Sequence, residues 1–244
     1  MTIESLLKPD DRVIMISGAS RGIGAAIAKH LVAEGYQLSL GVRSPEKVTE
    51  LLDKKYQERF TVSRFEATDP ETSIRWIEET NRAFGRIDGL VNNAGILRKV
   101  NFETGDEEDL DEMWTVNAKA PFRLIKLCLP YLRQSGNGRI VNIASTDGKR
   151  YRESVSVGYT MVKHALMAVS HAARFAGWDD GVRVTALCPG AVNTDLIANI
   201  PGVTPVNERL SPETIASMVS MLLSLPNTAS VAEMPINTRL ESSL

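Results

Sequence analysis

Short apolar runs alternate with stretches of helical periodicity along most of the chain, and this alternation limits the possible folds more than any other feature. The apolar runs predict six strands: Arg12–Ser17, Leu38–Val42, Phe60–Phe65, Ile87–Val91, Arg139–Ile143 and Val182–Leu187. After the first run, apolar residues recur at helical spacing from Ile23 to Glu34, and Gly35 follows as a helix stop. Strands separated by helices favour a parallel sheet covered on both faces. We therefore predict an α/β fold with a doubly wound, Rossmann-type sheet.

Start signals support the later helices. Asp69-Pro70-Glu71 and Ser211-Pro212-Glu213 each place a capping side chain before a proline, which is typical of a first helical turn. The acidic run Asp106–Glu112 favours the positive end of a helix dipole more than a metal site, and it precedes a helical stretch from Leu110 to Arg133. Two prolines in that stretch, Pro121 and Pro130, predict kinks or breaks.

Size and composition predict one domain spanning residues 1–244. The net charge of −2 gives no field that would attract nucleic acid or a membrane surface. No apolar run reaches the length of a membrane span, and the first residues lack the pattern of a signal peptide, so we expect a cytoplasmic protein. Cys128 and Cys188 are far apart and are expected to be free buried thiols. No Cys/His cluster has metal-ligand spacing, and we assign no metal.

A glycine-rich turn, Gly18-Ala19-Ser20-Arg21-Gly22-Ile23-Gly24, joins the first strand to the first helix. Exposed backbone N–H groups at a helix start bind a phosphate anion well, and glycine allows the close approach of a pyrophosphate. A tight turn of purely structural importance is the alternative. The strand before the turn and the helix after it favour dinucleotide binding.

The second predicted strand ends in Gly41-Val42-Arg43-Ser44, without the acid that usually binds the ribose 2′-hydroxyl of NAD. An arginine side chain suits a 2′-phosphate instead. Arg21 is a second cation expected near the same place. These residues predict NADP(H) in preference to NAD(H). The alternative is that both are ordinary surface arginines.

Tyr159 and Lys163 are four residues apart in a helical stretch and should share one helix face. A tyrosine with its ordinary pKa near 10 is a poor acid–base group at neutral pH, but a neighbouring ammonium lowers that pKa. Ser145 ends the fifth predicted strand, where its hydroxyl could stabilise charge on a substrate oxygen. A solvated helical Tyr–Lys pair is the alternative for the spacing taken alone.

These motifs together resemble the short-chain dehydrogenase/reductase family. The resemblance extends from the glycine turn through Asn92-Asn93-Ala94-Gly95, Asn117, Ser145 and the Tyr159/Lys163 pair to Pro189-Gly190-Ala191-Val192-Asn193-Thr194. It implies a Rossmann-type oxidoreductase with a cofactor half at about residues 10–145 and a catalytic and substrate half at about 145–244. It also implies a nicotinamide cofactor, a small-molecule carbonyl or alcohol substrate and a homo-oligomer, either a tetramer or a dimer.

The resemblance assigns a role to each matching residue. Tyr159 should be the acid–base group, Ser145 should polarise the carbonyl, Asn117 should help to anchor a water, and Lys163 should hold the ribose as well as tune the tyrosine. The cofactor should contact Tyr159, Lys163 and Arg43. It should also contact Gly18, Ser20, Arg21, Gly22, Ile23, Gly24, Glu66, Ala67, Asn93, Ala94, Gly95, Pro189, Gly190, Val192 and Thr194. Glu66 stands where many relatives have an aspartate.

Basic residues gather in segments that should border the substrate. They are Arg98, Lys99, Lys149, Arg150 and Arg152. The loop Thr146–Gly158 is attached to a catalytic residue at each end and should lie close to the substrate. Such a rim would attract a carboxylate or phosphate, which suggests a small oxo acid. A solvated surface loop or a subunit contact is the alternative.

The C-terminal part departs from the family pattern. Its usual Val-Asp-Gly-Gly ending is replaced by Ala232–Arg239, with a last strand expected near Met234–Thr238. The segment Asp195–Leu210 is expected to be a mobile substrate lid. Two other functions remain open at this point: a regulator that senses NADP(H) without turnover, and a scaffold or oligomerisation protein. An intact Ser–Tyr–Lys set argues against the first, and the glycine turn argues against the second.

Overall fold

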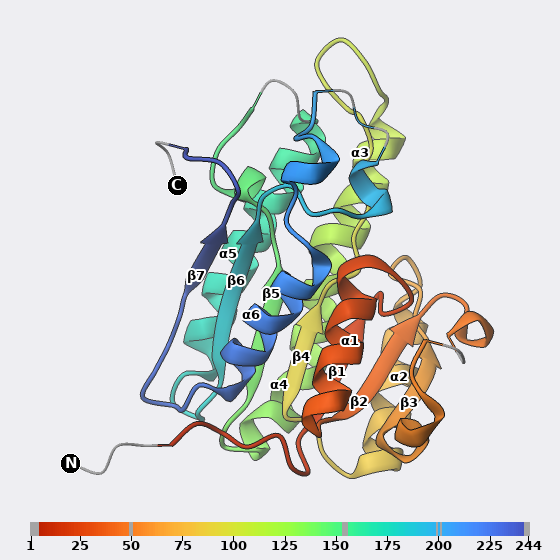
Figure 1. Ribbon diagram of the computed structural model, residues 1–244, viewed down its shortest axis with the longest axis vertical. Coiled ribbons are helices and arrows are strands. Elements are labelled where there is room, and N and C mark those ends of the chain that lie inside the picture. Colours follow the sequence, from red (N-terminus) through yellow and green to blue (C-terminus); the bar gives the residue numbers. More distant parts are fainter. Residues whose placement is uncertain (1–4, 49–50, 153–155, 199, 201, 242–244) are drawn as a thin grey trace.

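The seven strands of the described residues form one parallel sheet, as the alternating pattern predicts (Figure 1). The computed structural model describes residues 5–48, 51–152, 156–198, 200 and 202–241. The strands are β1 (Val13–Ser17), β2 (Gln37–Val42), β3 (Phe60–Arg64), β4 (Gly89–Asn92), β5 (Arg139–Ile143), β6 (Arg183–Pro189) and β7 (Glu233–Ile236). Their spatial order is β3-β2-β1-β4-β5-β6-β7, and every neighbouring pair is parallel. All six predicted strands and the last strand are confirmed, with ends shifted by at most a few residues.

Helices cover both faces of the sheet. Alternation along β1 directs Ile14 and Ile16 to one face, where they join α1 (Gly22–Glu34) and α6 (Pro212–Ser224) in one core cluster. Met15 points to the other face, whose core includes residues of α2 (Pro70–Phe84), α4 (Ala120–Gln134) and α5 (Val157–Gly177). Figure 1 shows α1 and α6 together in front of the sheet. The doubly wound architecture is therefore confirmed.

The predicted helix ends have the expected geometry. Gly35 stops α1 with a left-handed φ of 106°, which a glycine adopts without steric cost. The Asp69 carboxylate accepts the backbone N–H of Glu71 at the start of α2, and the Ser211 hydroxyl accepts that of Thr214 at the start of α6. Because these caps satisfy otherwise unpaired backbone donors, each helix begins at the residue that its sequence signal indicates.

One long helical stretch changes its geometry in the middle. It begins with α3 (Glu107–Trp114), which Asp106 caps, continues through a π-helical turn at Thr115–Lys119 and ends with α4. Pro121 lies just after the π turn, where its missing N–H cannot donate to the carbonyl of Asn117 four residues earlier. The prediction of an irregularity near Pro121 is confirmed. π turns of this kind are frequent at functional sites.

Cys128 and Cys188 are free and buried, as predicted. Burial raises the pKa of the Cys128 thiol to about 12 and that of Cys188 to about 11, so both stay protonated near neutral pH. Among the helices of the described residues, none has the length and apolar character needed to cross a membrane.

Candidate active site

A cavity of about 770 Å³ opens at the carboxyl ends of the strands, where the strand order reverses between β1 and β4. Ligands bind at this position in open α/β sheets. Most of the residues singled out in the sequence line it: Gly18, Ser20, Arg21, Gly22, Ile23, Arg43, Glu66, Ala67, Asn93, Ala94, Gly95, Ser145, Tyr159, Lys163, Pro189, Gly190, Val192 and Thr194. Gly24 and Asn117 do not line the cavity and lie behind its wall.

The glycine turn forms a close-packed cradle at one end of the cavity. Gly18 and Gly22 have φ angles of 69° and 55°, which side-chain-bearing residues rarely adopt. A Cβ atom on Gly24 would lie 2.3 Å from the Gly18 carbonyl oxygen and 2.5 Å from Asn93 Nδ2. That amide donates to the carbonyl oxygens of Ser17 and Gly18 at 3.0 and 3.1 Å. Gly18 and Gly22 are therefore required by their backbone angles, and Gly24 is required by the close packing around it.

The two arginines expected near the adenosine ribose have different surroundings. Arg21 Nη1 lies 3.1 Å from Asp195 Oδ2 in an exposed ion pair. Arg43 also lines the cavity, just past the end of β2, and the structure gives it no ion pair among the described residues. Within the part of the chain that the structure describes, Arg43 therefore keeps its charge unpaired at the cavity wall, whereas Arg21 shares its charge with Asp195.

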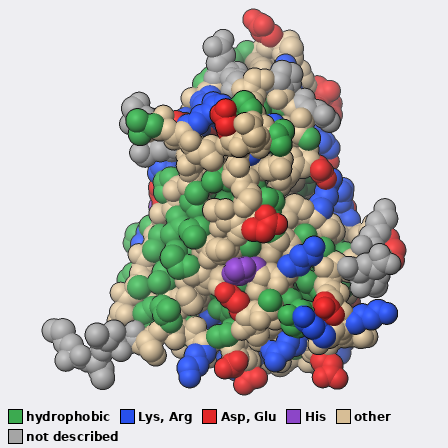
Figure 2. Space-filling model, in the orientation of Figure 1, with side chains coloured by type: hydrophobic (Ala, Val, Ile, Leu, Met, Phe, Trp, Pro, Cys, Tyr) green, Lys and Arg blue, Asp and Glu red, His purple; other side chains and the backbone are tan. Residues whose placement is uncertain are grey.

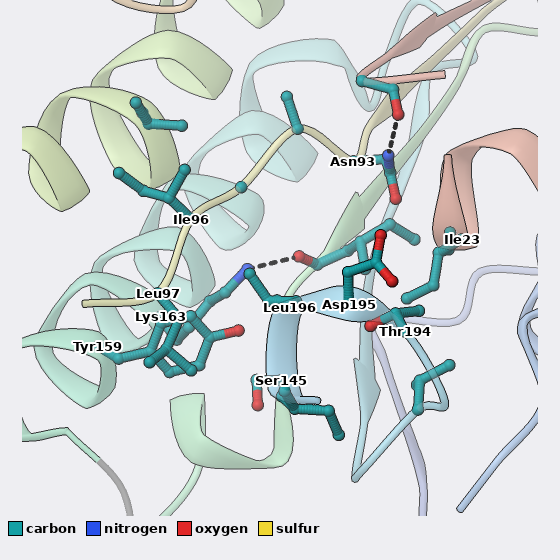
Figure 3. A pocket seen from close by; sticks show the side chains of 18 of the residues that line it. Ile23, Asn93, Ile96, Leu97, Ser145, Tyr159, Lys163, Thr194, Asp195 and Leu196 are labelled. Atoms are coloured by element: carbon teal, nitrogen blue, oxygen red, sulfur yellow. Dashed lines mark hydrogen bonds between the residues drawn. The ribbon is translucent and has the colours of Figure 1, made fainter. Parts of the chain in front are cut away.

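Ser145, Tyr159 and Lys163 meet on the other side of the cavity (Figure 3). Ser145 follows β5, whereas Tyr159 and Lys163 come from successive turns at the start of α5. Lys163 Nζ donates to the carbonyl oxygen of Ile143 at 2.8 Å and lies 5.5 Å from the centre of the Tyr159 ring. All three residues are buried. The predicted constellation is thus brought together by two elements that are separate in sequence.

The ionisation of the pair differs from the sequence expectation. Lys163 was expected to lower the pKa of Tyr159, but burial raises the pKa of Tyr159 above its ordinary value, and the nearby charge of Asp147 raises it further. Contact with Ser145 lowers the pKa only in part. Burial also lowers the pKa of Lys163 to about 8. The raised pKa keeps Tyr159 a protonated phenol at neutral pH, which is the form that donates a proton.

Asn117 supports the cavity wall from behind. Its side-chain oxygen accepts the N–H of Ile96 at 2.9 Å, and its amide donates to the carbonyl oxygen of Ile96 at 2.8 Å. Asn117 lies in the π turn, where Pro121 cannot provide the usual helical donor to its carbonyl oxygen. The side chain therefore fixes the strand-end loop that carries Ile96.

The structure corrects the predicted basic rim. Of the five residues expected in this rim, only Lys99 and Arg152 line the cavity. Arg98 pairs instead with Asp109 and Glu112. Lys149 pairs with Glu233, and Arg150 pairs with Asp147 and Glu241. Carboxylates therefore hold all three side chains in ion pairs. The partners Glu233 and Glu241 are distant in sequence and could not be recognised from the local pattern.

Several cavity residues were missed in the sequence. Asp147 and Ser156 lie within the loop that was expected near the substrate, but neither was singled out. Ser156 caps α5 by accepting the N–H of Tyr159 at 3.2 Å, and a serine before a helix start could have indicated this role. Apolar residues of the wall that were also missed include Ile96, Leu97, Leu196, Ile197, Ile200 and Val203. The last four belong to Asp195–Leu210, so the predicted lid segment does border the cavity; residues 199 and 201 lie outside the described residues.

The parallel sheet, the glycine cradle and the Ser–Tyr–Lys group together define an oxidoreductase of the dinucleotide-binding kind. Comparison with known families agrees, because the family described as short chain dehydrogenase matches residues 12–202. The chain belongs to the short-chain dehydrogenase family.

Similar proteins carry names of several reductases and dehydrogenases. An agropine synthesis reductase of Rhizobium rhizogenes is 41% identical over 94% of this chain and 53% of its own length. The chain spans about half the length of the curated relatives of that name. A levodione reductase of Leifsonia aquatica is 31% identical over 83% of this chain and 78% of its own. The solved structure of an alcohol dehydrogenase from Thermococcus sibiricus, complexed with 5-hydroxy-NADP, is 32% identical with a TM-score of 0.85 and covers 94% of this chain and 99% of that one.

Proposed function

We propose that the protein is an NADP(H)-dependent oxidoreductase that interconverts a carbonyl and a secondary alcohol on a small molecule. The observation that carries this proposal is the meeting of Ser145, Tyr159 and Lys163 in the same cavity as the glycine cradle. Relatives named as an agropine synthesis reductase, a levodione reductase and a 2,5-dichloro-2,5-cyclohexadiene-1,4-diol dehydrogenase support it. Oxidation of NADPH in the presence of a panel of ketones and oxo acids tests it.

The residues of the chain divide the work of the reaction. A bound nicotinamide supplies the hydride in reduction and accepts it in oxidation. Ser145 donates a hydrogen bond to the substrate oxygen, which gains negative charge as the carbonyl π bond opens. Tyr159 then transfers its phenolic proton to that oxygen, giving the alcohol, and takes the proton back in the reverse direction. Lys163 provides a cation that binds the ribose hydroxyls and stabilises the negative charge of the phenolate.

A sensor that binds NADP(H) without turnover is the alternative function. Binding would require the glycine cradle but no proton donor beside the nicotinamide. Burying the polar groups of Tyr159, Ser145 and Lys163 side by side costs free energy, because these groups lose their contact with water. A sensor would not need this arrangement. We therefore favour the enzyme.

We expect the protein to bind NADPH at least about tenfold more tightly than NADH, because a charge-assisted contact of Arg43 with the 2′-phosphate contributes about 1.5–3 kcal/mol. Arg43→Asp should reverse this preference by placing a carboxylate where a ribose hydroxyl can bind it. Fluorescence titration of both cofactors against both proteins measures the effect.

Arg64→Asp is the matched control for charge. Arg64 ends the neighbouring strand β3, is exposed and does not line the cavity, so its substitution should leave the ratio of affinities unchanged. Equal affinity of the wild type for NADPH and NADH would contradict the role of Arg43.

We further propose that the substrate carries an anionic group, which Arg152 and Lys99 bind. Both side chains line the same cavity as Ser145. The structure gives Lys99 no ion pair among the described residues, and Arg152 Nε lies 3.7 Å from Asp147 Oδ1. An oxo acid should then react with a lower KM than its methyl ester, and Arg152→Ala should raise the KM for the acid about tenfold without affecting the ester.

Lys149→Ala is the control, because Lys149 lies on the same loop but pairs with Glu233 away from the cavity. Its substitution should change neither KM. If acid and ester react equally well in the wild type, the basic residues do not select the substrate.

Self-association is also proposed. Strand β7 is an outer edge of the sheet, and an unpaired edge offers backbone groups to a second chain. Hydrophobic side chains gather on the left of the view in Figure 2. Met218 and Met221 of α6 and Met234 of β7 are each partly exposed. These features support a homo-oligomer, either a tetramer or a dimer.

A further inference from the structure

Asp147 is a buried carboxylate in the cavity, two residues after Ser145. It lies in the short helical turn Thr146–Gly148 that follows β5, and only 7% of its surface is exposed. Burying an ionised carboxylate is costly unless it is paired and hydrogen-bonded. The arrangement around Asp147 therefore indicates what its oxygens can bind.

The two carboxylate oxygens have different surroundings. Oδ1 accepts a hydrogen bond from Arg150 Nη1 and lies 3.7 Å from Arg152 Nε. Oδ2 has one weak partner among the described residues, the Ser145 hydroxyl at 3.4 Å. An ionised carboxylate oxygen accepts more than one good hydrogen bond. Oδ2, beside the Ser145 hydroxyl, can thus accept a further hydrogen bond, whereas Oδ1 is bound by the two arginines.

Arg150 holds this carboxylate in place. Its side chain is 9% exposed and binds Asp147 and Glu241, and its Nη2 donates to Thr146 Oγ1 at 3.1 Å. The backbone N–H of Asp147 also donates to Ser145 Oγ at 3.0 Å. Because these contacts fix the position of the carboxylate, Oδ2 stays next to Ser145 as a preorganised acceptor.

We infer that Asp147 selects the substrate by accepting a hydrogen bond from a hydroxyl or ammonium group on the carbon next to the reacting carbonyl. This inference rests on the proposed function, in which Ser145 binds the carbonyl oxygen. That oxygen and a donor atom on the adjacent carbon are separated by roughly one hydrogen-bond length, so one substrate can reach both Ser145 Oγ and Asp147 Oδ2. The preferred substrates are therefore α-hydroxy or α-amino carbonyl compounds, with the anionic group located farther away.

A substrate without this donor leaves Oδ2 buried against an apolar group. Sites built to hydrogen-bond a substrate reject analogues that lack the partner much more strongly than apolar pockets reject a small change in size. Hydroxyacetone and butanone have the same number of heavy atoms and differ by a hydroxyl in place of a methyl group. They isolate the proposed contact.

The test is the ratio of kcat/KM for hydroxyacetone to that for butanone, measured with NADPH. We expect the wild type to favour hydroxyacetone by at least about tenfold and to accept aminoacetone as well. In Asp147→Asn, Arg150 should bind the amide oxygen and turn the NH₂ group toward the substrate, where it cannot accept a donor. The ratio should then fall to about one.

Glu233→Gln is the matched control. Glu233 of β7 pairs with Lys149, which lies on the same loop as Asp147, and Glu233 does not line the cavity. Replacing its carboxylate with an amide should therefore leave the ratio unchanged. Equal kcat/KM for the two ketones in the wild type would overturn the inference, and this comparison needs no variant to fold. A proportional loss with both ketones in Asp147→Asn would also overturn it, because a purely structural role affects both equally. Absence of turnover with every carbonyl would instead remove the proposed function on which the inference depends.

Discussion

Tyr159→Phe is expected to lower the rate of carbonyl reduction by about 10²–10⁴-fold, the usual contribution of a positioned acid–base group. The phenol is 7% exposed and packs in a cluster with Met113 and Val162, and phenylalanine keeps that packing. Its raised pKa leaves the proton on the oxygen at neutral pH, so the variant loses the donor and little else. Single-turnover reduction with prebound NADPH measures the loss, and an NADPH titration should show nearly unchanged affinity.

Tyr151→Phe provides the matched control for removal of a tyrosine hydroxyl. Tyr151 is 52% exposed and lies outside the cavity that Tyr159 lines. Its substitution should leave the single-turnover rate unchanged. Near-normal turnover in Tyr159→Phe would mean that another group donates the proton.

Lys163→Met is expected to weaken NADPH binding and turnover while making the cofactor-free protein more stable at neutral pH. The ammonium is buried, and burial lowers its pKa to about 8 from the ordinary 10.5. At pH 7 the lysine is charged in both the folded and the unfolded states, so the full cost of burying the charge is present. Removing it should raise the free energy of unfolding by about 1–3 kcal/mol, after allowing for the lost hydrogen bond to Ile143.

The pH dependence of this effect has a definite sign. Between about pH 8 and 10.5 the folded wild type has released the proton of Lys163 while the unfolded chain still holds it. Wild-type stability therefore rises with pH in this window, and the advantage of Lys163→Met should shrink there. Urea denaturation at a series of pH values measures it, with Lys126→Met on the exposed surface of α4 as control. Constant relative stability across that window would contradict the low pKa.

Most of the fold could be predicted because its signals are local. Each strand is a short apolar run, and residues such as Asp69, Ser211 and Gly35 mark helix ends through their own backbone chemistry. The glycine turn could be placed for the same reason, since the φ angles of Gly18 and Gly22 require glycine. Local patterns of this kind are sufficient wherever the nearest neighbours in sequence are also the physical partners.

The charges of the site could not be assigned in the same way. Arg150 was expected to face the substrate, but its partner Glu241 is 91 residues away, and no local pattern indicates that pair. The raised pKa of Tyr159 depends on burial, which appears only when α5 packs against the loop after β5. Asp147 was missed because a lone acid in a polar loop has no distinguishing neighbours. Charge pairing and desolvation are properties of the assembled fold.

The measurement that tests the central claim most directly is the stoichiometry of turnover by the wild-type protein. NADPH and a carbonyl substrate from the panel are supplied together, and both NADPH consumed and alcohol formed are quantified. The account predicts one alcohol for each NADPH oxidised, with the signal lost in Tyr159→Phe and retained in Tyr151→Phe. Saturable NADPH binding without alcohol formation from any carbonyl would contradict it and would indicate a cofactor sensor instead.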